Sequence, residues 1–156
     1  MKDAVEAKTG HTLGRNTQLF SWLVEWAADS MNRYKVMSNG KTPFNMVNGR
    51  ERHARVAGFG ERILYMPLRS RKQTKEKLEM KLQYGHFIGI SMRTDELLIG
   101  TSDGVVKART IKRLIENERL QWRSLSNVKG TPTFPVPGGR MRIIPISTKE
   151  CQTLEA

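Results

Sequence analysis

The sequence predicts an α+β protein in which an N-terminal helical segment precedes a small antiparallel sheet and an extended tail rich in proline and glycine. Three observations lead to this class. Apolar residues recur at helical spacing over residues 18–34, short runs of Val, Ile, Leu and Phe separated by turn formers fill 85–113, and three prolines and three glycines interrupt 130–139. Each of these stretches indicates one part of the fold.

The strongest predicted helix covers residues 18–34. Asn16-Thr17 offers an N-cap, and Leu19, Trp22, Leu23 and Trp26 recur on one face of the helix. So broad an apolar face needs cover, and the short segment before it is poorly suited to provide it. We therefore expect either that another chain covers this face or that the helix ends a larger domain.

Two shorter elements are expected next. Residues 42–49 begin with a Thr42 cap and Pro43 and end at Asn48-Gly49, which predicts one or two helical turns. Residues 61–68 have the composition of a strand that Pro67 closes.

A polar and basic stretch, residues 69–81, has no periodic apolar face and is predicted to be a long loop. One interpretation is an arm that contacts phosphates, and the other is a solvated surface loop. The arm would use five cations: Arg69, Arg71, Lys72, Lys75 and Lys77.

Residues 85–113 are predicted to form three short strands, with turns at 93–96 and 102–104. Asp103-Gly104 is a strong hairpin signal. In the strand that follows, alternation places Val105, Lys107, Arg109, Ile111 and Arg113 on one distinctly cationic face, where each residue lies roughly 6.6 Å from the next on that face. This face either meets anionic groups of an extended partner or protects a sheet edge from aggregation.

The chain after residue 113 is predicted to hold little regular structure. Residues 116–125 are expected to form a short amphipathic helix that carries Trp122, and 130–139 an extended linker. One last strand is expected over 140–146.

Composition limits the possible partners. The 156 residues have a net charge of +12, of which residues 41–156 contribute +11, and this balance favours a polyanion. Apolar runs are too short for a membrane span, and the N-terminus lacks the pattern of a signal peptide, so an intracellular protein is expected. The single Cys151 excludes an internal disulfide and, with three scattered histidines, a zinc finger.

Four motifs resemble the region that follows the integrase core in polyproteins of copia-type retrotransposons. They cover most of the chain in the order of that family: WLVEWAADSMNRYKVMSNGKTPFNMVNGR (Trp22–Arg50), FGERILYMPL (Phe59–Leu68), LIGTSDGVVKARTIKR (Leu98–Arg113) and GTPTFPVPG (Gly130–Gly138).

The resemblance implies a particular domain organisation. Residues 1–50 would be a helical remnant of the ribonuclease-H-like catalytic core, 57–114 a small Src-homology-3-like β-barrel, and 115–156 a short helix and extended tail. The parent enzyme is a metal-dependent DNA integrase that uses acidic residues to hold divalent ions.

No catalytic or metal-binding residue carries over from the family, because its acidic triad lies upstream of the tryptophan helix. Glu25 and Asp29 lie one turn apart on that helix, where a solvated face is the expected explanation. The chain is expected to be a non-enzymatic fragment of a polyprotein or a degenerate copy. Mg or Mn would belong only to the complete parent enzyme.

We therefore expect a module that binds DNA or other nucleic acid with little sequence preference and supports DNA integration, with no small-molecule substrate. The expected contacts are the five cations of residues 69–81 together with Lys107, Arg109 and Arg113. One alternative is an assembly module for integrase subunits or the missing catalytic core, favoured by exposed Trp22 and Trp26. Another is an inert transposon remnant. An active parent element would place the chain in the nucleus or in a cytoplasmic particle.

Overall fold

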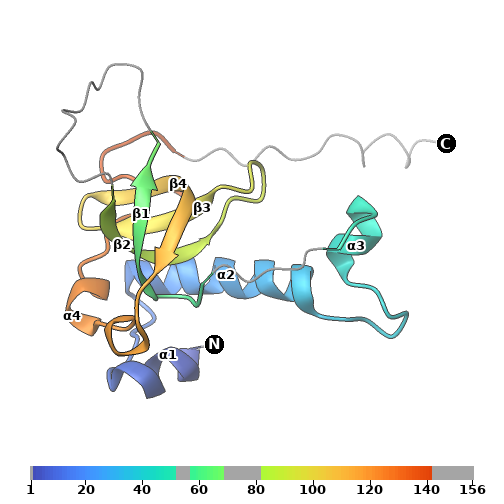
Figure 1. Cartoon of the computed structure of the whole chain (residues 1–156), viewed down its shortest axis with the longest axis horizontal. Helices are drawn as coiled ribbons and strands as arrows, with labels where there is room; N and C mark the ends of the chain where they lie inside the picture. The colour runs from blue at the N-terminus through green and yellow to red at the C-terminus, as the bar shows by residue number, and fades with distance from the viewer. Residues whose placement is uncertain (1, 52–56, 69–81, 142–156) are drawn as a thin grey trace.

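A computed structural model describes residues 2–51, 57–68 and 82–141 of the chain (Figure 1). It confirms an α+β protein with an N-terminal helical part and a small antiparallel barrel. In chain order the elements are α1 (Lys2–Thr9), α2 (Gln18–Tyr34), α3 (Pro43–Asn48), β1 (Arg62–Pro67), β2 (Gln83–Ile90), β3 (Leu97–Thr101), β4 (Gly104–Arg113), the 3-10 helix η1 (Glu116–Glu118) and α4 (Trp122–Leu125).

The four strands form a closed barrel in which each strand pairs with the next and β4 returns to β1, always antiparallel. Closure leaves no strand of the barrel with an unpaired edge. The hairpin predicted between the last two strands is present. Because Thr101 pairs with Gly104, its two-residue turn is Ser102-Asp103, one residue earlier than predicted.

Both predicted N-terminal helices are present with their caps. The Thr17 hydroxyl accepts a hydrogen bond from the Phe20 N–H at 3.3 Å, and the Thr42 hydroxyl accepts one from the Asn45 N–H at 3.1 Å. Gly49 ends α3 in the left-handed conformation, at φ 66°. These local signals were therefore sufficient to place both helix starts.

The expectation that the apolar face of α2 is left uncovered by this chain is wrong. Trp22 is 1% exposed and Trp26 is 4% exposed. The Trp26 ring meets Phe87 of β2 edge to face at 5.2 Å between centroids, and the Trp22 indole N–H donates to the Gly130 carbonyl at 2.9 Å. The barrel and the segment after α4, both distant in sequence, supply the cover.

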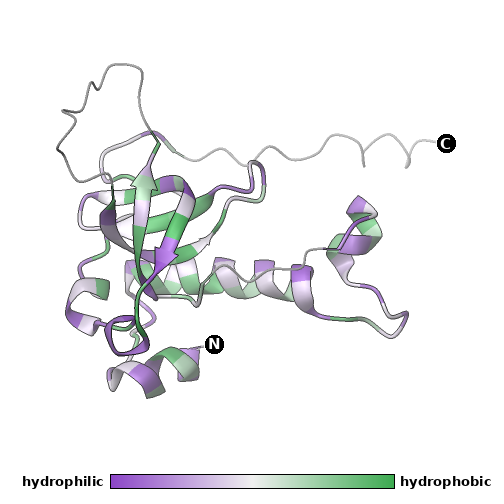
Figure 2. Cartoon of the chain, in the orientation of Figure 1, coloured by the Kyte–Doolittle hydropathy of each residue, from purple (hydrophilic) through white to green (hydrophobic). Residues whose placement is uncertain are grey.

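One hydrophobic core joins the N-terminal helices, the barrel and the segment that follows it. In Figure 2, the hydrophobic residues gather on the strands and along α2. The predicted units 1–50, 57–114 and 115–156 all contribute to this core. Its largest fully buried side chains are Leu13, Trp22, Ile63, Phe87, Ile88, Ile99 and Leu125.

The chain after β4 differs from the single helix and extended linker that were predicted. Helical structure over 116–125 is split into η1 and α4. Residues 129–135 then fold against the β3–β4 hairpin: the Lys129 N–H donates to the Thr101 carbonyl at 3.1 Å, and the Val105 N–H donates to the Pro135 carbonyl at 2.8 Å. The strand predicted over 140–146 lies almost entirely outside the described residues.

Gly130 makes this folding back possible. Its φ is 95°, its carbonyl accepts from Trp22, and its N–H donates to the Gln18 side chain at 2.8 Å. A Cβ at this position would collide with the Pro135 carbonyl. Only glycine fits both the backbone conformation and the space.

We predict that Gly130→Ala lowers the free energy of unfolding more than Gly138→Ala does. Gly138 also has a positive φ, 73°, but a Cβ there meets nothing within 4 Å. The control should therefore lose only about 1 kcal/mol from backbone strain, and Gly130→Ala several times that amount. Chemical denaturation of the two variants measures the difference, and equal losses would contradict the packing of the 129–135 segment.

Candidate nucleic-acid interface

The outer surface of the barrel is covered on one side and open on the other. Trp26 of α2 and Val128 cover the outer surface of β2 and β3 at two glycines. A Cβ added at Gly89 would lie 3.9 Å from the Trp26 ring, and one added at Gly100 would lie against Val128. His86 of β2 hydrogen-bonds the Ser124 hydroxyl of α4 at 3.0 Å. By contrast, β1 and β4 face the viewer in Figure 1 with none of the described helices across them.

The strand register places three side chains in one row across this open side. Leu64 of β1 pairs with Tyr84 of β2 and with Lys112 of β4. Directly opposite residues of antiparallel strands share a face. Since the neighbours Ile63 and Tyr65 are buried inside, Lys112, Leu64 and Tyr84 point outward. We call the row, together with Arg62, the open face.

Arg62 and Tyr84 form a stacked pair on the open face. The guanidinium carbon of Arg62 lies 4.2 Å from the centre of the Tyr84 ring, within the range of a cation–π interaction. Tyr84 nevertheless remains 52% exposed. Within the described ranges, neither the half-buried Arg62 nor the exposed Lys112 has a carboxylate partner, so no acidic side chain there neutralises either charge.

Lys107 and Arg109 lie on the outer surface of β4, as predicted. They share one carboxylate: Glu96 lies 3.4 Å from the Lys107 ammonium and 3.7 Å from the Arg109 Nε. A hydrogen bond from Thr94, followed by the interactions with Lys107 and Arg109, holds the pKa of Glu96 below its usual value. The two side chains remain 49% and 77% exposed, so this group keeps an excess positive charge.

Arg113 does not share the face of Lys107 and Arg109, so the prediction of one continuous cationic face is wrong. Between the pairs Tyr65–Ile111 and Pro67–Ala108, β4 contains one more residue than β1. Such a bulge reverses the alternation of the strand beyond it. Arg113 instead forms a two-point contact with Glu61, at 2.6 Å and 2.9 Å.

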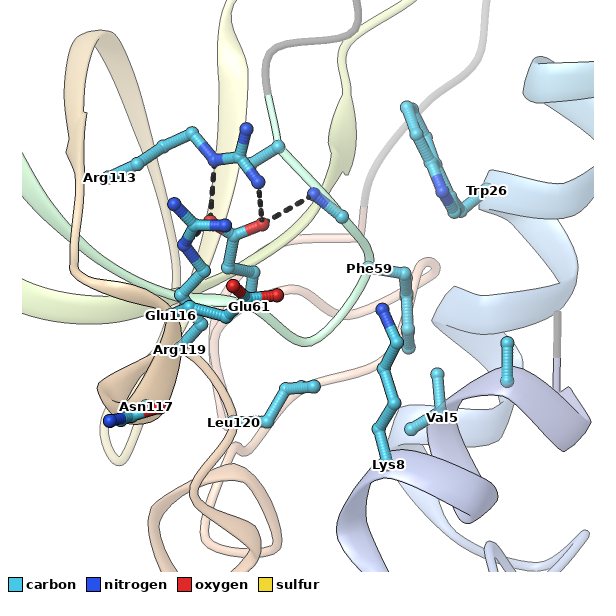
Figure 3. Close-up of a pocket in the computed structure, with 13 residues that line it drawn as sticks. Val5, Lys8, Trp26, Phe59, Glu61, Arg113, Glu116, Asn117, Arg119 and Leu120 are labelled. Carbon is cyan, nitrogen blue, oxygen red and sulfur yellow. Dashed lines mark hydrogen bonds and ion pairs between the residues drawn. The ribbon is translucent and has the colours of Figure 1, made fainter.

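Glu61 is the centre of a cluster beside a cavity of about 620 Å³ that lies between α1 and the barrel (Figure 3). Besides Arg113, the Gly58 N–H donates to its carboxylate at 2.9 Å, and Arg119 lies at 3.5 Å. Burial alone raises the pKa of Glu61, but these hydrogen bonds and charges outweigh burial and lower the pKa. The carboxylate is fully engaged and holds the start of β1 to the end of β4.

The cavity itself combines apolar and charged walls, and three of its charged side chains, Glu61, Arg113 and Arg119, are paired with one another. Its apolar lining comes from α1, α2 and the approach to β1, and its charged lining is mixed in sign. The labelled residues in Figure 3 are Val5, Lys8, Trp26, Phe59, Glu61, Arg113, Glu116, Asn117, Arg119 and Leu120.

Asp29 corrects another expectation, because it is buried rather than solvated. It is 5% exposed, and its carboxylate accepts from the Arg33 Nε at 2.7 Å. Arg33 also reaches Asp95 in the β2–β3 turn at 3.5 Å. Asp29 therefore helps hold this turn against α2.

The five predicted cations Arg69, Arg71, Lys72, Lys75 and Lys77 lie outside the described residues. Sequence reasoning missed Arg62, Tyr84 and Lys112. Arg62 belongs to the predicted first strand, and Tyr84 immediately precedes the residue where the sheet was expected to begin. In the sequence, Tyr84 closely follows the basic stretch 69–81, which was an available signal, but only the barrel register shows which residues are its neighbours.

Two other kinds of feature are absent from the described part of the chain. It contains no group of three or more His, Cys, Asp or Glu residues placed to hold a metal ion. It also contains no helix that is long and apolar enough to cross a membrane. Comparison of the sequence and structure with protein-family models, curated proteins and solved structures gave no match.

We predict that Glu61→Gln lowers the free energy of unfolding at neutral pH by roughly 1–3 kcal/mol, because it removes charged hydrogen bonds to Arg113. Glu116→Gln is the matched control, since Glu116 lines the same cavity and is exposed. Denaturant titration of both variants gives the comparison.

The pH dependence of this effect has a definite sign. A carboxyl whose folded-state pKa is lowered adds stability above its unfolded pKa of about 4.5, and that stability is lost as the pH falls through the folded-state value. The gap between wild type and Glu61→Gln should therefore narrow below about pH 4.5. A gap that stays constant down to pH 2 would contradict the ion pair.

Proposed function

We propose that this chain is a non-catalytic module that binds nucleic acid through the outer surface of β1 and β4. The observation that carries the proposal is the open side of the barrel, where Arg62 and Lys112 have no carboxylate partner within the described ranges. A cationic surface free of neutralising groups attracts phosphates by releasing their counterions.

Lys107 and Arg109 extend this surface along β4. This surface therefore carries four outward cations: Arg62 on β1 and Lys107, Arg109 and Lys112 on β4. Within the described residues, Glu96 is the one carboxylate that forms ion pairs with any of them. Contacts to phosphates carry no sequence information by themselves. The module is therefore proposed to bind with little sequence preference.

The motif order supports a more specific proposal, in which the module belongs to the integrase region of a copia-type retrotransposon polyprotein. The barrel would then be of the Src-homology-3-like kind, and binding would support DNA integration. Four short antiparallel strands closed on themselves are compatible with that kind of barrel. The divalent ions of integration would be held by the complete parent enzyme, and the chain would act in the nucleus or in a cytoplasmic particle.

The alternative of an assembly module loses its main support. It relied on Trp22 and Trp26 being exposed, and both are buried within this chain. Contacts with other subunits through the tryptophan face would require α2 to leave the barrel. Binding of nucleic acid requires no such rearrangement, because the open side is already accessible.

We predict that the double variant Lys107→Ala/Lys112→Ala binds a short DNA more weakly than wild type and with a flatter salt dependence. Removing two phosphate contacts should reduce the slope of log K against log salt by roughly 1.4–1.8. Fluorescence anisotropy at several salt concentrations between low and physiological values measures this slope.

Lys35→Ala/Lys41→Ala is the matched control. It removes the same charge from exposed positions between α2 and α3, away from the barrel. Its slope should stay close to that of wild type. Equal losses in both double variants would show that net charge, rather than this surface, drives binding, and no binding at low salt would refute the proposed function.

A further inference from the structure

We propose that the open face binds single-stranded nucleic acid and that a base stacks on the ring of Tyr84. The inference rests on the proposed function and adds to it the class of nucleic acid. A surface that only neutralises phosphates serves double and single strands alike, whereas a stacking ring requires an unpaired base.

The position of the Tyr84 ring favours stacking by a base. It lies on the outer surface near the start of β2, it is 52% exposed, and the backbone at Tyr84 pairs with Leu64 of β1. Arg62 packs against the ring at 4.2 Å from its centre, which restricts the ring without covering it. A ring held in this way can receive a base with little loss of side-chain freedom.

The side chains around the ring also suit a base. Leu64 separates Tyr84 from Lys112 in the outward row, and Met66 on the same strand is 43% exposed. Apolar side chains beside a ring suit the flat faces of bases, which a duplex keeps stacked inside. The open face therefore offers an apolar strip bordered by cations, rather than cations alone.

The spacing between the ring and the cations suits a strand whose base lies on Tyr84. Tyr84 and Lys112 are two strand spacings apart, or about 10 Å at roughly 4.8 Å per spacing. Arg62 lies directly on the ring. A base on Tyr84 therefore has one cation next to it and another across the row for the flanking backbone, which is the usual combination in single-strand binding proteins.

The test uses the full chain and three labelled probes: a twelve-residue thymidine oligonucleotide, a duplex of the same length, and an abasic strand with the same number of phosphates. Tyr84→Leu removes the ring, and Tyr84→Phe keeps it and removes only the hydroxyl. Tyr84→Trp supplies a larger ring. Thermal unfolding of each variant checks that it folds.

Tyr84→Leu is expected to weaken binding of the thymidine strand by roughly five- to hundred-fold, the effect of losing one stacked base, and to leave the abasic strand unaffected. Its salt slope should stay that of wild type, because stacking releases no counterions. Tyr84→Phe should bind as wild type does, and Tyr84→Trp at least as tightly.

Two results separate this inference from the proposed function. The stacking is overturned if salt-dependent binding is the same in wild type, Tyr84→Leu and Tyr84→Trp. It is also overturned if the duplex binds more tightly than the thymidine strand. Either result leaves the proposed function standing. No binding of any probe at low salt overturns both.

Discussion

The packing of two tryptophans from α2 against the barrel is the contact on which the rest of the structure depends. Trp26 meets Phe87 of β2, and Trp22 reaches the Gly130 carbonyl, so one helix face joins the barrel to the chain that follows β4. Each buried aromatic removes about 150–250 Å² from water. At about 25 cal/mol per Å², this amounts to at most roughly 4–6 kcal/mol for each ring.

This contact also decides which side of the barrel is available to a ligand. Gly89 and Gly100 have no side chain, which lets Trp26 and Val128 approach the outer surface of β2 and β3 closely. The helix and the returning chain occupy that side. The cations of β1 and β4 remain on the other, so the candidate binding surface is a consequence of where the helix docks.

The basic residues of the barrel therefore differ in what they do, although the sequence presents them as one group. Arg113 of β4, like Arg33 of the neighbouring α2, is committed to a buried carboxylate and holds elements together. Lys107 and Arg109 share Glu96, while Arg62 stacks on Tyr84. A net charge of +12 favours an anionic partner but says nothing of this division.

The sequence by itself determined the helices with their Thr17 and Thr42 caps and the β3–β4 hairpin, because caps, turns and periodicity depend on neighbouring residues. It also determined the charge imbalance. Only the tertiary structure decided what covers Trp22 and Trp26, where Gly130 returns to α2, and how the bulge in β4 turns Arg113 away. These features join residues up to 112 positions apart, and no local pattern specifies which distant segments will pack together.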